Sequence, residues 1–240
     1  MQLLHSFSLN LTVEQMLVQQ GRAPGVGPAP AEMVRLYQQA IDKAKELAEP
    51  VAMYDVFPVR AAQDDGLILA DGHVLRSHLV VAQLARAEQI AVAICTIGSR
   101  LEEEASRAFA AGQGVMGFLY DSAGSLAVSH MAREVVQQVQ ERAKQQGQKA
   151  SFPISPGSAD CTLEDQRVVF DLLPAQRIGV RLTDSLLMVP LKSVSLLIGL
   201  GRDLPTTHDL AQCDFCERRD KCGHYRLRTM HAFEQNDKDR

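Results

Sequence analysis

The 240-residue sequence has no tryptophan, and aromatic residues make up only 5% of it. Lysine and arginine are scattered along the chain, and the formal net charge is -4 at pH 7. Proteins that bind nucleic acids usually gather basic residues on one surface and place aromatic side chains among them. The composition therefore argues against a nucleic-acid partner. Hydrophobic residues form 46% of the chain, which is enough to build a substantial core.

Long hydrophobic runs are also missing, because no stretch approaches the roughly 20 apolar residues that cross a bilayer. The first residues, Met1 to Ser6, lack the basic start and apolar segment of a secretory signal. We therefore expect a cytoplasmic protein with no membrane partner. The five cysteines, an odd number with three close together, fit a reducing compartment better than a disulfide framework.

Phosphate-binding glycine loops and a Ser-His-Asp pattern are absent as well, so the hydrophobic pattern has to indicate the fold. Helical spacing of apolar residues predicts helices at 31–48, 77–87, 115–146 and 163–173. Alternating or β-branched residues predict strands at 51–59, 67–69, 89–96, 177–182 and 194–200. Residues 8–20 fit a helix or a strand, and 147–162 a loop. The mixture indicates an α+β fold.

Two local features refine the helices. Ser99 and Glu102 have the spacing of a capping box, which predicts a helix from Ser99 to Ala110. Gly117 and Gly124 lie inside the long helix at 115–146, where each glycine costs about 1 kcal/mol relative to alanine. Such glycines indicate either close packing of another chain segment or ligand, or a simple kink.

The last third of the chain contains short motifs in a defined order. They are Ser155-Pro156-Gly157, Leu163-Glu164-Asp165-Gln166, Ile178-Gly179, Leu182-Thr183-Asp184-Ser185, Met188-x-Pro190 and Ser193-Val194-Ser195. Further upstream are Thr96-Ile97-Gly98 and Asp121-x-x-Gly124-Ser125-x-Ala127-Val128. In this order the motifs resemble the activation domain of cobalamin-dependent methionine synthase, and the resemblance covers most of the chain. It implies a twisted antiparallel sheet packed with helices in residues 1–202, followed by a Cys-rich tail in residues 203–240.

The resemblance also implies a function. In that family the domain binds S-adenosylmethionine in an extended groove, beside a corrinoid that a partner domain presents. An electron from flavodoxin reduces cob(II)alamin, and the donor's methyl group traps the product as methylcobalamin. We therefore expect a corrinoid-binding protein or cobalamin-dependent methyltransferase as partner, and a flavodoxin- or ferredoxin-type reductant. By resemblance, the groove residues are Ser129, Pro156, Gly157, Ser158, Thr183, Asp184 and Ser185.

Three positions depart from the family pattern. In the family, this segment reads Arg-x-x-Pro-Gly-Tyr. This chain has Pro153 at the arginine position, Ser158 at the tyrosine position, and Ser129 at the position of a glutamate in the long helix. Arginine would bind the carboxylate of the donor with two parallel hydrogen bonds, which proline cannot make. Either other residues, such as Arg60, Arg177 or Arg181, take over this recognition, or the Pro-Gly pair is only a structural turn.

The tail carries a second constellation, Cys213-x2-Cys216-x5-Cys222. Two thiolates at this spacing chelate one ion from a single turn, and a third nearby cysteine supplies most of a tetrahedral shell. An iron–sulfur cluster and zinc both fit; Cys161, His208 and His224 are candidates for a fourth ligand. The alternative is three free, reduced cysteines.

Three functions therefore remain open. The first is an activator that supports reductive activation or methylation of a corrinoid with S-adenosylmethionine. The second is a non-catalytic docking or iron–sulfur electron-carrier module of a corrinoid methyltransferase complex that has lost the methyl donor. The third is a zinc-stabilised small-molecule binder unrelated to corrinoids.

Overall fold

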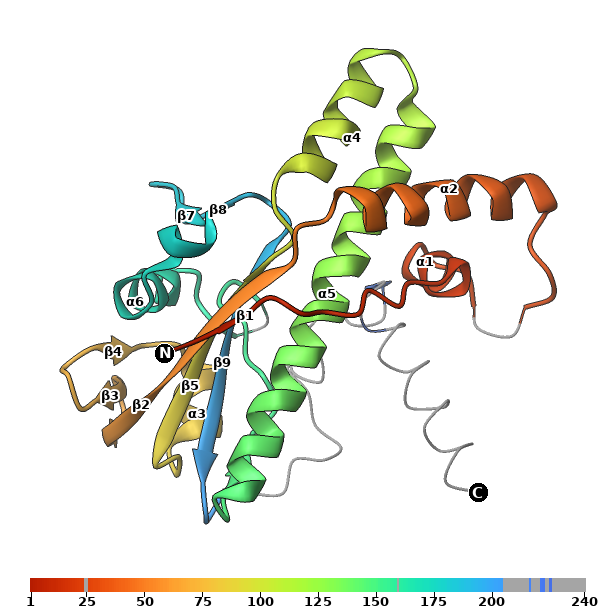
Figure 1. Ribbon diagram of the computed structural model, residues 1–240. Helices are drawn as coiled ribbons and strands as arrows, with labels where there is room; N and C mark the ends of the chain where they lie inside the picture. The colour runs from red at the N-terminus through yellow and green to blue at the C-terminus, as the bar shows by residue number, and fades with distance from the viewer. Residues whose placement is uncertain (24–25, 159, 205–215, 217–220, 223–224, 226–240) are drawn as a thin grey trace.

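The computed structural model describes residues 1–23, 26–158, 160–204, 216, 221–222 and 225 (Figure 1). In this part of the chain a curled antiparallel sheet of seven strands forms the centre, in the order β4-β3-β2-β5-β9-β6, with β1 paired to β2. The strands are β1 Gln2–Leu4, β2 Val51–Gln63, β3 Gly66–Leu69, β4 Val74–Leu75, β5 Gln89–Thr96, β6 Lys149–Ala150 and β9 Ser193–Gly201. The predicted α+β fold with a twisted antiparallel sheet is confirmed.

Helices cover both faces of the sheet. Those of the described residues are α1 Val13–Gln19, α2 Ala31–Leu47, α3 His78–Leu84, α4 Arg100–Ala110, α5 Gly114–Gln145, α6 Asp165–Leu172 and the 3-10 helix η1 Ala175–Ile178. Helices α1, α2, α4 and α5 pack on one face, and α3 and α6 pack on the other. Among the described residues, no helix is both long and apolar enough to cross a membrane.

The central strand β5 shows how the sequence produces this two-sided packing. Ala91, Ala93 and Cys95 contribute to the core under α5, whereas Ile90, Val92 and Ile94 contribute to the core on the opposite face. Successive side chains of a strand point to opposite faces, so a strand buried on both sides is apolar at every position. The small side chains on one face leave room for the long helix α5.

Helices α4 and α5 form a hairpin that projects beyond the end of the sheet (Figure 1). A Cβ atom added to Gly117 would lie 2.9 Å from the ring of Phe109 and 3.0 Å from the carbonyl oxygen of Ala105. At Gly124 it would lie 3.2 Å from Leu101 Cδ2 and 3.2 Å from Lys192 Cγ. Both glycines therefore allow close packing within the chain, as the first of the two sequence interpretations predicted.

Two local predictions were wrong. Ser99 makes no side-chain cap bond: its hydroxyl donates to Glu103 Oε1 at 2.7 Å, because Ser99 has helical φ/ψ angles (-93°, -19°) rather than extended ones. The strand predicted at 177–182 is shorter, since Arg177 belongs to η1 and Gly179 ends that turn with φ of 73°. Only Arg181–Leu182, β7, is a strand, paired with β8 Met188–Val189.

Candidate functional site

The Pro–Gly loop, residues 155–158 and 160–162, leaves the outer edge of β9. Just before it, Ile154 pairs with Leu197, with both backbone N–H···O distances at 2.8 Å. Gly157 has φ of 85°, and its N–H donates to the carbonyl of Cys161 at 2.9 Å. A Cβ at this position would lie 2.9 Å from Leu163 Cδ1. The loop therefore favours glycine at this position for its backbone conformation, and a larger residue would also displace the end of the Leu163 side chain.

A buried carboxylate ties the Pro–Gly loop to helix α3. Asp165, which is 2% exposed, accepts hydrogen bonds from the backbone N–H of Arg76 at 2.9 Å and of Ser77 at 3.1 Å, and from the Ser77 hydroxyl. The Ser77 oxygen in turn accepts from the N–H of Thr162 at 2.8 Å. We call Ser77 and Asp165 the latch, because together they join α3, α6 and the end of the loop.

A second buried bond fixes α6 to the sheet. The hydroxyl of Ser195 donates to Oε1 of Gln166 at 2.8 Å, and both side chains are almost fully buried. Buried polar groups without partners are costly, so this pair explains a polar residue in the middle of β9 and another on the inner side of α6. Asp165, Gln166 and Ser195 therefore have structural roles in the motifs that resemble the activation domain.

The Asp-x-x-Gly-Ser motif of α5 surrounds one lysine. Lys192 Nζ lies 2.7 Å from Asp121 Oδ1 and donates to Ser125 Oγ at 3.0 Å, and its side chain is 12% exposed. The aliphatic part of Lys192 packs against Gly124, where no side chain intervenes. Sequence reasoning missed Lys192, because nothing near it in the sequence indicates a partner 67 residues away.

Ser129 lies one turn beyond Ser125 on α5. Its hydroxyl donates to the carbonyl oxygen of Ser125 at 2.8 Å, and the residue is half-buried. Helix α5 packs against β9, and the Pro–Gly loop leaves the edge of the same strand. Helix α5 covers one face of the sheet, whereas Ile154 and Cys161 on either side of the loop belong to the core on the other face, so a shared ligand site of Ser129 and the Pro156-Gly157-Ser158 segment stays a prediction.

The third predicted groove segment, Thr183-Asp184-Ser185, forms the turn between β7 and β8. Thr183 Oγ1 accepts from the N–H of Leu187 at 3.0 Å and lies 3.0 Å from Ser185 Oγ. Asp184 and Ser185 are exposed. The hydroxyl groups of this turn stabilise the turn itself, and their contribution to a ligand site stays a prediction.

The cysteine constellation lies largely outside the described residues. Cys213 is not described, whereas Cys216 and Cys222 are half-buried free cysteines. Among the residues that the structure describes, no group of three His, Cys, Asp or Glu side chains is arranged to hold a metal ion. The iron–sulfur or zinc site at Cys213, Cys216 and Cys222 therefore stays a prediction.

Cys161, a candidate fourth ligand, is engaged elsewhere. It is 3% exposed and its thiol donates to Ser77 Oγ at 3.3 Å, so it belongs to the surroundings of the latch. Burial raises the pKa of the Cys161 thiol to about 11, and the nearby Asp165 carboxylate acts in the same direction. The thiol therefore stays protonated at neutral pH in this metal-free structure, and its role as a fourth ligand stays a prediction.

Comparison with known proteins supports the fold. No protein-family model matches the chain, and no curated protein matches it significantly. Among solved structures, the chain is similar to the MetH reactivation domain bound to AdoHcy, with a TM-score of 0.58 and 16% sequence identity. The match covers 95% of this chain and 88% of the other. At this identity the likeness concerns the fold, and the chain therefore has the fold of the MetH reactivation domain.

Proposed function

We propose that this protein supports the reductive activation or methylation of a corrinoid carried by a methionine synthase or a related methyltransferase, with S-adenosylmethionine as the methyl donor. One observation carries the proposal: nearly the whole chain has the fold of a reactivation domain whose solved structure holds AdoHcy, the demethylated form of that donor. The left-handed conformation of Gly157, in the loop that follows Ile154 at the edge of β9, agrees with it.

The proposed site lies between Ser129 of α5 and the Pro–Gly loop. The Ser129 hydroxyl donates to the carbonyl of Ser125, and we propose that its oxygen accepts from the ammonium group of the donor when the donor binds. Gly157 gives the loop its left-handed backbone conformation, with φ of 85°. Pro153 has no donor for the carboxylate of the ligand, so we expect weaker binding than an arginine at this position would give. The bound donor would supply the methyl group, while the chain positions and orients it.

Calorimetric titration with S-adenosylmethionine and AdoHcy tests this function. We expect saturable binding of both, with at least a threefold loss of affinity in Ser129→Ala. A matched control is Ser106→Ala, because Ser106 on α4 makes the same kind of bond, donating to the carbonyl of Glu102 at 2.9 Å. Absence of heat at millimolar ligand, or equal loss in both variants, would contradict a ligand site at Ser129.

The alternative is a docking or iron–sulfur electron-carrier module without a methyl donor. It is favoured by the latch and by the Gln166–Ser195 pair, which give the activation-domain motifs structural roles that need no ligand. Partner binding without ligand binding would support the docking version. The electron-carrier version predicts iron and visible absorbance in anaerobically purified protein, both lost in Cys213→Ser, Cys216→Ser and Cys222→Ser, whereas zinc alone would contradict it.

A further inference from the structure

Large apolar side chains are exposed around the α4–α5 hairpin. Phe109 is 51% exposed, Val115 65%, Phe118 53% and Leu191 62%. Exposed apolar residues are ordinary when scattered singly, but a contiguous group of them marks an interaction site. The question is therefore whether these four side chains lie on one side of the hairpin.

Two anchoring contacts place them on the same side. The N–H of Leu191 donates to Glu102 Oε2 of α4 at 2.8 Å, and the next residue, Lys192, pairs with Asp121 of α5 at 2.7 Å. The side of the hairpin that carries Glu102 and Asp121 therefore faces the 191–192 segment. Helix positions three, four or seven apart share a face, so the anchors show which other residues lie on this side.

The sequence spacing from Glu102 and Asp121 places the three remaining apolar residues on the same side of the hairpin. Phe109 follows Glu102 by seven positions, or two turns of α4. On α5, Phe118 precedes Asp121 by three positions, and Val115 precedes Phe118 by three. We call Phe109, Val115, Phe118 and Leu191 the hairpin patch. At 1.5 Å per residue it extends about 10 Å along the hairpin from Leu191 to Phe109.

The hairpin patch is firmly held. Gly117 lets the ring of Phe109 pack directly onto α5. Beside Leu191, the carbonyl of Lys192 accepts from the N–H of Ile97 at 3.2 Å, and Ser193 Oγ donates to the carbonyl of Pro190 at 2.7 Å. Side chains already fixed in place lose little conformational entropy when a partner covers them.

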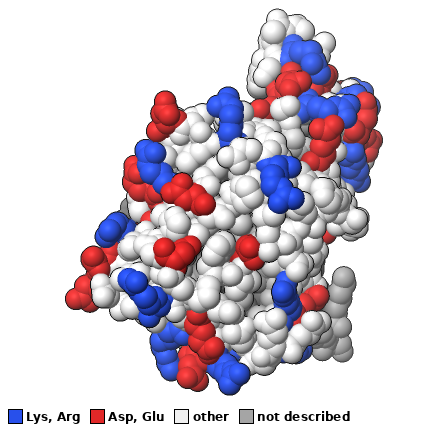
Figure 2. Space-filling view, turned by 60° about the vertical axis from the view of Figure 1, so that its left-hand side comes forward, with Lys and Arg blue, Asp and Glu red and all other residues white. Residues whose placement is uncertain are grey.

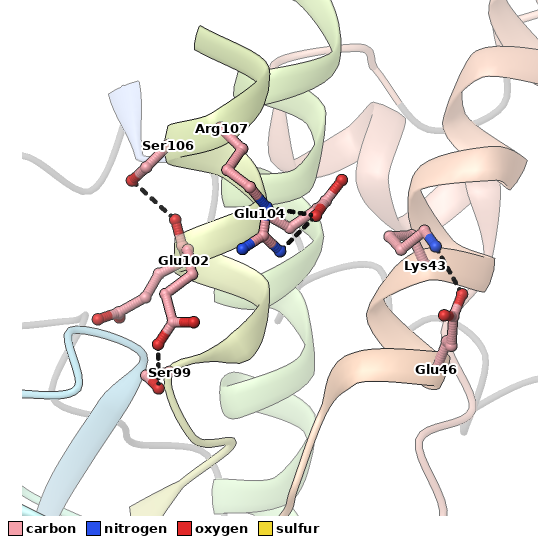
Figure 3. A network of polar contacts seen from close by, with 8 residues as sticks. Lys43, Glu46, Ser99, Glu102, Glu104, Ser106 and Arg107 are labelled. Atoms are coloured by element: carbon pink, nitrogen blue, oxygen red, sulfur yellow. Dashed lines mark hydrogen bonds and ion pairs between the residues drawn. The ribbon is translucent and has the colours of Figure 1, made fainter. Parts of the chain in front are cut away.

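Among the described residues, two of the acidic groups near the hairpin patch are paired with cations: Glu104 with Arg107 at 2.6 Å (Figure 3) and Asp121 with Lys192 at 2.7 Å. Glu102 and Glu103 accept hydrogen bonds from the uncharged N–H of Leu191 and hydroxyl of Ser99, so they leave negative charge beside the patch. On the face drawn in Figure 2, acidic and basic side chains are intermixed and no large area of one sign appears. Binding to an anionic membrane needs a basic rim around the apolar residues, whereas Glu102 and Glu103 lie beside this patch, so it favours a protein surface instead.

The size of the hairpin patch distinguishes a transient partner from a stable dimer. Four half-exposed side chains of this kind present about 400 Å² of apolar surface. A standard stable interface buries about 800 Å² on each partner. A second copy of the chain would therefore be held only weakly. A partner that binds transiently needs no larger buried area than the hairpin patch provides.

The hairpin patch is continuous with the proposed donor site. Val115, Phe118, Asp121, Ser125 and Ser129 follow one another on α5 at spacings of three, three, four and four, so they form a single stripe along the helix. One end of the stripe is apolar and exposed, and the other end is the residue that we propose to contact the methyl donor. From Phe118 to Ser129 the stripe is about 16 Å long at 1.5 Å per residue, so a partner of domain size seated on the patch spans the distance to the donor site.

We propose that the hairpin patch is the docking surface for the corrinoid-carrying protein, held transiently while its corrinoid faces the Ser129 end of α5. This inference rests on the proposed function, because only that function makes the partner a corrinoid carrier. Phe118 and Leu191 form the centre of the contact, and Phe109 and Val115 extend it toward the tip of the hairpin.

Biolayer interferometry of the full chain against the cobalamin-loaded, cobalamin-binding domain of a methionine synthase tests the docking surface. We expect micromolar binding, at least tenfold weaker in Phe118→Asp and in Leu191→Asp. The matched control is Val34→Asp, an exposed valine on α2 that is 38% exposed and outside the patch. Thermal unfolding by circular dichroism confirms that each variant is folded, and the same titration with AdoHcy reports the donor site separately.

Each outcome decides between the alternatives. No binding by the wild type, or equal binding by wild type and both patch variants, overturns the proposal. Concentration-dependent dimerisation that Phe118→Asp abolishes would assign the patch to a second copy, and binding to phosphatidylglycerol vesicles would assign it to a membrane. Docking without AdoHcy binding would contradict the proposed function but support the hairpin patch as a docking surface. AdoHcy binding without docking would support the donor site but contradict the docking surface.

Discussion

The Pro–Gly loop and the Thr183–Ser185 turn both carry motifs of the activation domain, but the fold uses them differently. The loop is tied down by a buried carboxylate whose partners lie 88 and 89 residues away in the sequence. The turn is exposed, and its hydroxyl groups bond over two to four residues. The motif at the loop is therefore part of the core, while the motif at the turn is a local surface structure.

This difference shows that a matching motif can be explained by the fold rather than by a ligand. Gln166 and Ser195 match the family pattern and bond to each other, and the neighbouring Asp165 bonds to α3, so these residues fix α6 whatever ligand is present. The positions expected to touch the ligand, Pro153 and Ser158, are among those that differ. A matching motif thus supports the fold more strongly than it supports the binding of S-adenosylmethionine.

The largest expected effect is that of Asp165→Ala. It leaves two backbone N–H groups and the Ser77 hydroxyl buried without acceptors, so we expect the free energy of unfolding to fall by about 3–5 kcal/mol. Urea unfolding followed by circular dichroism measures it. The neighbouring Glu164→Ala is the control, because Glu164 is exposed and paired only with Arg167 among the described residues. Similar losses in both variants would show that the latch contributes nothing.

Gly157→Ala separates backbone conformation from packing in the loop. A side chain at φ of 85° is strained, and its Cβ would meet Leu163, so we expect a loss of about 1–3 kcal/mol in the same measurement. Gly147→Ala is the matched control, because Gly147 has φ of 69° but no heavy atom within 4 Å of an added Cβ. If the two variants lose equal stability, the contact with Leu163 has no effect.

Raising the pH tests the surroundings of the latch through Cys161. Its folded pKa of about 11 lies above the ordinary value of 9.0, so its stabilising contribution is fully present below pH 9 and is lost as the pH rises toward 11. At pH 10 the loss is about 1 kcal/mol. We expect the stability of the wild type to fall more steeply between pH 9 and 11 than that of Cys161→Ala. Parallel curves would place this thiol in contact with solvent.

The smallest effect is expected for Thr183→Ala in the surface turn. It removes two exposed hydrogen bonds, to the N–H of Leu187 and to Ser185 Oγ, which water can replace, so we expect a loss of about 0.5 kcal/mol. Chemical denaturation alongside Asp165→Ala gives the comparison directly. A loss as large as that of Asp165→Ala would mean that the turn, like the loop, is part of the cooperative core.

Local sequence patterns predicted most of the elements. The strand at 89–96 was predicted with its observed bounds, and the long helix within one residue at each end, because both are set by unbroken apolar patterns. The capping box at Ser99 failed because Ser99 adopts helical angles, while Glu102 binds Leu191, 89 residues away. The strand at 177–182 failed because Gly179 ends a 3-10 turn within it.

The candidate site also has features that the sequence predicts and features that only the tertiary structure shows. The sequence by itself determined the α+β class and the positions where the family pattern is broken, since these depend on residue type and short spacing. Only the tertiary structure decided that Ser77 and Asp165 form a latch, that Lys192 joins α5 to β9, and that four apolar residues share one side of the hairpin. Such contacts join residues far apart in the chain, and no local pattern specifies which distant partner a buried carboxylate or lysine meets.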